Sequence, residues 1–258
     1  MKRWIPVFAA AALAAAFFAG KAQRLVYDND TLVSGMNMKF LSERIGENQM
    51  EDARMQIVYQ LARRSVVKVA VKDSAAGGIV WKIGGEDIVI VSNRHLLMKD
   101  VTAKVTFYNG ECADGEIIGY SQQYDIGFLR ISPENVTAKI LRDIYEAVPA
   151  EYELSALDSF ADTPVLQIGA DLSGNKEHFS MGSIIGIGYE PVFNTNVLKT
   201  RCYSKAGMSG GGVFDMGGRL LGMLSGGEVA EDAQIREAEI SYSLPVMLIA
   251  DEFECLNE

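Results

Sequence analysis

Residues 65–72 read SVVKVAVK, and at this stretch the hydrophobic pattern of the chain changes. Every second residue from Val67 to Val71 is valine, and the positions between them are lysine or alanine. An alternation with a period of two predicts a β-strand with one buried and one exposed face. Residues 23–64 lack this period, so we expect the folded domain to begin at about residue 65.

Short apolar segments separated by glycine-containing turns continue this pattern along the chain. The predicted strands cover residues 77–83, 88–92, 105–107, 116–120, 126–131, 164–168, 183–189, 197–203, 212–214, 220–225 and 240–244. The turn sequences at 84–87 and 109–110 indicate hairpins. A helix from about Pro245 to Leu256 is expected to follow the last strand, since proline is tolerated in a first helical turn.

The predicted strands form two clusters on either side of a linker near residues 132–160. Many short strands with glycine-rich turns predict an all-β fold, here two small antiparallel barrels. Barrel one is expected at about 65–135 and barrel two at about 160–245, within one domain of residues 65–258.

The composition is typical of a folded protein and argues against nucleic-acid binding. Hydrophobic residues make up 48% of the 258 positions, enough for a sizeable core. The chain carries 34 acidic and 24 basic residues, for a net charge of −10. A nucleic-acid site needs a surplus of lysine and arginine on one face, so we expect no nucleic-acid partner.

The cysteines and histidines give little support for a metal site or a disulfide framework. Cys112, Cys202 and Cys255 cannot all pair within the chain, which leaves a 202–255 bridge or free thiols as alternatives. The chain has no CxxC motif, and its two histidines, His95 and His178, lie far apart in sequence. We therefore expect no metal and no cofactor.

The first 22 residues are typical of an export signal. Lys2 and Arg3 precede an uncharged run over residues 4–20, and small residues follow at Gly20 and Ala22. As a helix the run would span about 25 Å, slightly less than a hydrocarbon core of about 30 Å. A cleaved signal peptide and a retained membrane anchor both remain open, with a buried core helix as the third alternative. The first two place the domain outside the cytoplasm.

Residues 23–64 are polar and favour a helix with a patchy apolar stripe. We interpret them as a helical spacer between the membrane and the domain. An arm through which the chain forms a homo-oligomer is the alternative.

The sharpest local motif is at residues 207–212, which read GMSGGG. A nucleophilic serine needs a tight turn that exposes its hydroxyl and directs backbone N–H groups to one point, and glycine permits both. An ordinary glycine-rich turn is the alternative. The motif also fits the α/β-hydrolase elbow, where the catalytic histidine follows the serine. Here no histidine follows His178, so the chain order excludes that fold.

Two further residues complete a candidate set around Ser209. His95 follows the predicted strand 88–92, and histidine titrates near neutral pH without further help, as a general base must. Asp125 precedes the apolar strand 126–131, where a carboxylate can orient an imidazole and stabilise its cation. Taken singly, each has a simpler interpretation: His95 as an ordinary histidine at a barrel edge, and Asp125 as an aspartate in a turn.

Together these motifs resemble the trypsin-like serine proteases, and most closely their HtrA-like branch. The matching segments are 92–95 (SNRH), 125–129 (DIGFL), 207–211 (GMSGG), 213–222 (VFDMGGRLLG) and 243–245 (SLP). The resemblance extends over about residues 65–256. It implies two six-stranded-type antiparallel barrels, one supplying His and Asp and the other Ser, with a short C-terminal helix.

The resemblance also implies a role for each motif residue. Ser209 would be the nucleophile, His95 the base and then the acid, and Asp125 the group that orients the imidazole. The backbone N–H groups of Gly207 and Ser209 would form the oxyanion hole.

For substrate binding, the family pattern points to two places in barrel two. Ser225, Gly226 and Gly227 match the strand that lines the substrate backbone, although Ser225 can equally be an ordinary strand-end serine. Tyr203 matches the base of the pocket for the residue that precedes the cut bond.

The chain departs from the family pattern in two places. Gly212 stands where proline or alanine is frequent, and too few residues follow Pro245 for the PDZ domain common in the HtrA-like branch.

The expected function is a serine endopeptidase that cleaves polypeptides through an acyl-enzyme. A catalytically silent double-barrel binding or scaffold module is the alternative.

Overall fold

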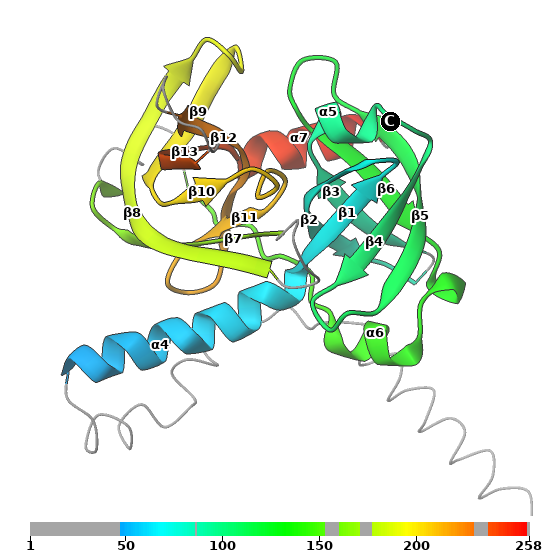
Figure 1. Cartoon of the computed structure of the whole chain (residues 1–258), viewed down its shortest axis with the longest axis horizontal. Helices are drawn as coiled ribbons and strands as arrows, with labels where there is room; N and C mark the ends of the chain where they lie inside the picture. The colour runs from blue at the N-terminus through cyan, green and yellow to red at the C-terminus, as the bar shows by residue number, and fades with distance from the viewer. Residues whose placement is uncertain (1–46, 86, 153–159, 171–176, 230–236, 257–258) are drawn as a thin grey trace, which may run out of the picture.

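A computed structural model describes residues 47–85, 87–152, 160–170, 177–229 and 237–256. The signal or anchor segment expected at 1–22 lies outside the described residues, as does most of the spacer expected at 23–64. Two barrels lie side by side in Figure 1, with helix α4 extending below them and helix α7 at their junction.

Barrel one is a closed six-stranded antiparallel barrel in the order β1-β2-β3-β6-β5-β4. Its strands are β1 (Val66–Val71), β2 (Ser74–Ile83), β3 (Ile88–Ser92), β4 (Thr102–Phe107), β5 (Cys112–Tyr120) and β6 (Gly127–Ile131). The pairing of Val67 with Phe107 on β4 closes the ring. Val67, Val69 and Val71 are buried and Lys68 is half-buried, as the alternation at 65–72 predicts. Burying each valine contributes about 1.5–3 kcal/mol.

Barrel two closes through six strands in the order β7-β8-β9-β13-β12-β11. Its strands are β7 (Pro164–Ala170), β8 (Glu177–Glu190), β9 (Thr195–Arg201), β11 (Gly212–Phe214), β12 (Leu220–Val229) and β13 (Glu237–Pro245). The ring closes where Ser241–Ser243 of β13 pair with Leu198–Thr200 of β9. A two-residue strand, β10 (Ser204–Lys205), pairs with β13 beyond the point where β9 ends.

The predicted fold class is confirmed, with small differences at element ends. Tyr203 lies between β9 and β10, two positions past the end of a strand expected to reach it. Pro245 is the last residue of β13, and the C-terminal helix α7 begins one residue later (Val246–Leu256). The linker near 132–160 contains two short helices, η2 (Pro133–Asn135) and α6 (Ala138–Asp143).

A hydrophobic cluster packed from both barrels and both long helices holds the halves together. It includes Val58 of α4 (Glu47–Ala62), Trp81 and Phe128 of barrel one, Leu244 of barrel two and Ile249 of α7. Phe253 of α7 lies against two aromatic rings of barrel one, with centroids 6.3 and 5.4 Å away. The helix that follows the last strand of barrel two therefore packs on barrel one.

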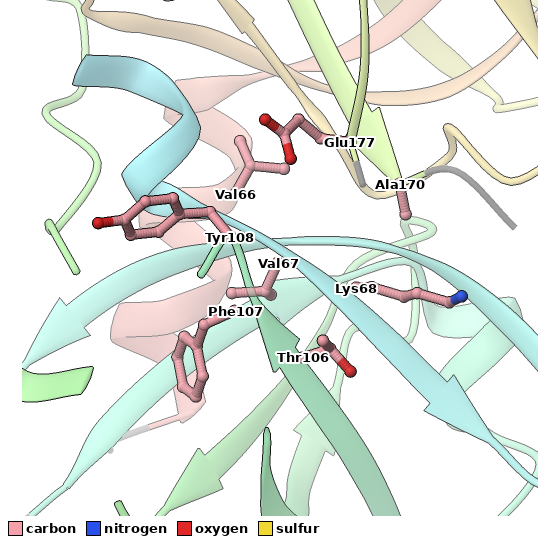
Figure 2. Close-up of a pocket in the computed structure, with 8 residues that line it drawn as sticks. All are labelled: Val66, Val67, Lys68, Thr106, Phe107, Tyr108, Ala170 and Glu177. Atoms are coloured by element: carbon pink, nitrogen blue, oxygen red, sulfur yellow. The ribbon is translucent and has the colours of Figure 1, made fainter. Parts of the chain in front are cut away.

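Helix α4 continues through η1 (Arg63–Ser65) into β1 at the other side of the junction. Where β1, β4 and the facing ends of β7 and β8 meet, a shallow crevice remains (Figure 2). Its lining residues are Val66, Val67, Lys68, Thr106, Phe107, Tyr108, Ala170 and Glu177. Among the described residues, none of the helices is long and apolar enough to span a membrane.

Candidate active site

His95 and Asp125 form a direct contact at one end of barrel one. His95 lies in the short helix α5 (Arg94–Leu97), which begins just after β3, and Asp125 lies just before β6. The Nδ1 atom of His95 is 2.8 Å from Oδ2 of Asp125, and the backbone N–H of His95 donates to Oδ1 at 2.9 Å. The imidazole is 56% exposed, whereas the carboxylate is 19% exposed.

This geometry assigns the tautomer of His95. An ionised carboxylate only accepts hydrogen bonds, so Nδ1 of the neutral ring must carry the proton. Nε2 then keeps its lone pair and faces away from Asp125. An imidazole in this state can take a proton from a hydroxyl and is stabilised as a cation by the carboxylate behind it.

The segment before Asp125 is shaped by side chains that bond to its backbone. Arg94 Nη1 donates to the carbonyls of Ser121 and Gln122 at 2.9 and 3.0 Å. The hydroxyl of Ser121 accepts from the N–H groups of Gln123 and Tyr124 at 3.0 and 2.9 Å. These contacts fix the turn that presents Asp125 to the residue next to Arg94.

Ser209 directly follows a tight turn of residues 205–208, in the loop between β10 and β11. The N–H of Met208 donates to the carbonyl of Lys205 at 3.1 Å, and Gly207, the third residue of this turn, has a φ of 95°. A positive φ at the third position is the mark of a type II turn and favours glycine. Within the described part of the chain, the N–H groups of Gly207 and Ser209 have no acceptor. Two free donors flanking Met208 suit a developing oxyanion.

The loop of Ser209 is bonded to barrel one through Gly77 of β2. The N–H of Gly77 donates to the carbonyl of Ser209 at 2.6 Å, and the hydroxyl of Ser92 donates to the carbonyl of Gly77 at 2.7 Å. A Cβ on Gly210 would lie 2.1 Å from that carbonyl, so only glycine permits the approach. The loop therefore rests against β2, and the Gly77 carbonyl at this contact also accepts from Ser92, the last residue of the strand that leads to His95.

A second bond between the barrels joins Asn93 and Ser225. Asn93 Nδ2 donates to Ser225 Oγ at 2.9 Å and to the backbone carbonyl of Asp125 at 3.2 Å. Both Asn93 and Ser225 are buried. Ser225 lies at an irregularity of β12, where the pairing with β13 shifts register between Leu224 and Gly226.

The remaining residues expected at the substrate site lie around this strand. Gly226 and Gly227 are half-buried, and the ring of Phe193 packs 3.0 Å from where a Cβ of Gly226 would be. Tyr203 is 36% exposed, its ring lies 5.7 Å from that of His178, and its carbonyl accepts from Ser180 Oγ at 2.7 Å.

The structure thus brings His95 and Asp125 together and bonds the backbone of Ser209 to barrel one. Among the described residues, no hydrogen bond joins Ser209 Oγ to His95. Sequence reasoning assigned no role to Asn93 or Gly77. The position of Gly77 inside a predicted strand could have identified it, since a glycine there often marks a close approach of another backbone.

The cysteines are all free thiols, so no 202–255 bridge is present. Cys112 and Cys255 are exposed, whereas burial raises the pKa of the Cys202 thiol to about 11. Within the described ranges, no group of three or more His, Cys, Asp or Glu side chains is arranged to hold a metal ion.

Comparison with known proteins places this geometry in context. The family model described as "Trypsin-like peptidase domain" matches residues 76–223, a span that contains His95, Asp125 and Ser209. The curated "Serine protease Do-like HtrA" of Lactococcus lactis subsp. lactis (strain IL1403) is 21% identical over 182 residues, which cover 67% of this chain and 42% of that protein. The "Serine protease HtrA-like" protein of Staphylococcus epidermidis (strain ATCC 35984) is 29% identical over 161 residues, which cover 57% and 26%. The chain spans less than half the length of either relative.

Solved structures share the fold at low sequence identity. The Rv3671c protease of M. tuberculosis H37Rv, in an inactive form, matches with a TM-score of 0.61 and 17% identity, covering 78% of this chain and 93% of that one. An "HtrA-type protease AlgW with tripeptide" matches with a TM-score of 0.64 and 16% identity, covering 78% and 62%.

Proposed function

The chain belongs to the trypsin-like peptidase family, and from this we propose that it is a serine endopeptidase that cleaves polypeptides through an acyl-enzyme. The observation that carries the proposal is the contact of His95 Nδ1 with Asp125 at 2.8 Å, in a barrel to which the backbone carbonyl of Ser209 is bonded through Gly77. This contact leaves Nε2 of His95 as the available base. The HtrA-like relatives support the same activity.

In the proposed mechanism, His95 Nε2 takes the proton of the Ser209 hydroxyl while the Ser209 Oγ atom attacks the scissile carbonyl. The oxyanion that forms accepts hydrogen bonds from the N–H groups of Gly207 and Ser209. The imidazolium then gives its proton to the leaving amine, the C–N bond breaks, and the acyl group stays on Ser209. Water, deprotonated by His95, then attacks the ester, the C–O bond to Ser209 breaks, His95 returns the proton to the Ser209 oxygen, and the acid is released.

Asp125 would act throughout by holding the imidazole in one tautomer and stabilising its positive charge. We propose that Ser225, Gly226 and Gly227 line the substrate backbone and that Tyr203 lies at the base of the pocket for the residue before the cut bond. In support, Gly226 and Gly227 retain exposed surface on β12, directly after the buried Ser225.

We also propose that the domain works outside the cytoplasm, after export directed by residues 1–22 or while anchored through residues 4–20. The basic pair Lys2-Arg3 before an uncharged run supports this. Residues 23–64 would then be a helical spacer or an arm for self-association, and α4 lies within that range.

The test of the proposed activity is labelling by a serine-reactive fluorophosphonate, run alongside hydrolysis of casein or a peptide. Wild-type protein should be labelled and should turn over substrate, whereas Ser209→Ala should do neither. Ser209 is only partly buried, so losing its hydroxyl leaves no large cavity, and the thermal midpoint should not fall.

His95→Ala should lose nearly as much turnover as Ser209→Ala, because triad members act as a unit. Retention of activity within about tenfold of wild type in Ser209→Ala would exclude this assignment, since loss of a triad member costs orders of magnitude more. A wild-type protein that is folded and yet unlabelled would favour the silent double-barrel module.

A further inference from the structure

Asn93 is fully buried and occupies the position directly before helix α5, which carries His95. Its backbone carbonyl accepts from the N–H groups of Leu96 and Leu97, so it is the N-cap residue of the helix. Asparagine is among the best N-cap residues because its side-chain oxygen can accept a helix N–H. Here the side chain makes no capping bond.

The amide of Asn93 is instead directed toward the two halves of the candidate site. Nδ2 donates to the backbone carbonyl of Asp125, in barrel one, at 3.2 Å. It also donates to the hydroxyl of Ser225, in barrel two, at 2.9 Å. One NH₂ group therefore bonds to the residue that contacts His95 and to Ser225, the first of the three β12 residues proposed to line the substrate.

This orientation is unfavourable for Asn93 itself. Within the described residues, the Oδ1 atom is buried and has no hydrogen-bond partner. A buried acceptor without a donor lowers stability, and the capping bond it forgoes would have raised stability. Buried acceptors are normally paired, and an N-cap asparagine normally caps its helix. Residues that depart from such rules are concentrated at functional sites, where the geometry matters more than stability.

We propose that Asn93 is a positioning residue, whose amide fixes the distance between the His95–Asp125 pair and the substrate strand at Ser225. The inference rests on the proposed peptidase function. Ser225 lies at a register shift of β12, where the strand's own pairing with β13 is interrupted, so a bond from barrel one sets its place. A displacement of about 1 Å at a reacting centre can cost about a hundredfold in rate.

The bond can be removed from either end. Asn93→Ser keeps a side chain that can cap α5 but is too short to reach Ser225, and Ser225→Ala removes the acceptor without altering α5. Each variant should lower kcat for peptide hydrolysis by about tenfold with little change in KM. The double variant should lose no more than either single variant, because both remove one interaction.

Ser243→Ala is the matched control. Ser243 is fully buried in β13, and its hydroxyl has no partner among the described residues. Its kcat should equal that of the wild type. Asn93→Ser should keep a thermal midpoint close to that of the wild type, whereas a purely structural residue would lower the midpoint and leave kcat of the folded fraction unchanged.

A second measurement does not depend on catalysis. The chain has two histidines, so the ring signals of His95 can be assigned by NMR with a His178→Gln variant. We expect these signals to shift in Asn93→Ser and in Ser225→Ala but not in Ser243→Ala. If Asn93→Ser does not fold, Ser225→Ala reports on the same bond.

The outcomes separate this inference from the proposed function. An unlabelled, inactive wild type would contradict the proposed function, and the His95 signals would still test the positioning role. An active wild type with unchanged kcat and unchanged His95 signals in both variants overturns the inference. A double variant whose kcat is about a hundredfold below that of the wild type also overturns the inference, because additive losses mean that Asn93 and Ser225 have independent roles.

Discussion

Gly207 decides, at the scale of one residue, whether the loop around Ser209 can present its N–H groups. Its φ of 95° lies in a region that other residues reach only with strain. A side chain there would favour a different peptide orientation, which would turn the Gly207 N–H away from the oxyanion. The proposed mechanism depends on that N–H.

We therefore expect Gly207→Ala to lower kcat by about 10²–10³-fold, the loss typical of one oxyanion-hole donor. KM should change little, since the donor acts mainly on the transition state. Gly110→Ala is the matched control, because Gly110 has a φ of 82° and open space around its Cβ position in a distant hairpin. Both variants should lose about 1–2 kcal/mol of stability, but only Gly207→Ala should lose activity in steady-state kinetics. Equal kcat values in the two variants would contradict the oxyanion role.

At the scale of elements, helix α4 is fastened to barrel two by Glu177, the first residue of β8. Tyr59 Oη donates to Glu177 Oε1 at 2.6 Å, and Arg63 Nη2 lies 2.5 Å from the same oxygen. The Glu177 side chain is only 9% exposed. The ring of Tyr59 also lies 4.4 Å from that of Phe179. The helix that precedes barrel one thus contacts barrel two through a nearly buried carboxylate.

Glu177→Gln should lower the free energy of unfolding by about 1.5–3 kcal/mol, the usual worth of a hydrogen bond to a charged group. Glu111→Gln is the control, because Glu111 forms a more exposed pair with Lys139 at 3.1 Å. Such surface pairs contribute at most about 1 kcal/mol. Denaturant unfolding of both variants checks the difference, and equal losses would mean that α4 is not held by this carboxylate.

The stabilisation that the contact of Tyr59 with Glu177 provides depends on pH. Burial, and after it the hydrogen bond to Glu177, raise the pKa of Tyr59 from 10.0 to about 12. The native state therefore holds the phenol proton more tightly than the unfolded chain does. This contribution to stability is complete below pH 10 and is lost as the pH rises to about 12. The stability difference between wild type and Tyr59→Phe should shrink across that window, and a constant difference would contradict the assignment.

At the scale of the whole molecule, export is the property that the N-terminus predicts. In the proposed export, Lys2 and Arg3 before the uncharged run at 4–20 would orient the N-terminus toward the cytoplasm. We expect mass spectrometry of the native protein to find either a start near Gln23 or an intact N-terminus in the membrane fraction. Full-length protein recovered only from the soluble cytoplasm would contradict both forms of the proposal.

Both barrels contribute residues to the proposed site, so neither barrel carries all of them. His95 and Asp125 come from barrel one, and Ser209 and Ser225 come from barrel two. Within the described part of the chain, a bond from Gly77 to Ser209 and a bond from Asn93 to Ser225 cross the junction. A hydrophobic cluster shared by both barrels and by α7 holds that junction in place.

The sequence by itself determined the fold class and the candidate chemistry. The period of two at 65–72 reflects the local geometry of a strand, and glycine turns mark strand ends whatever the rest of the chain does. The order of His95, Asp125 and Ser209 excluded the α/β-hydrolase elbow without any structure.

Only the tertiary structure decided how these residues are held. Asn93 and Ser225 lie 132 positions apart, and Tyr59 and Glu177 lie 118 apart. Nothing local distinguishes Asn93 from an ordinary N-cap residue, because its partners are set by how the two barrels pack. Periodicity records which face of a strand is buried but not what lies against it, and a hydrogen bond between distant segments forms only once packing has placed both groups.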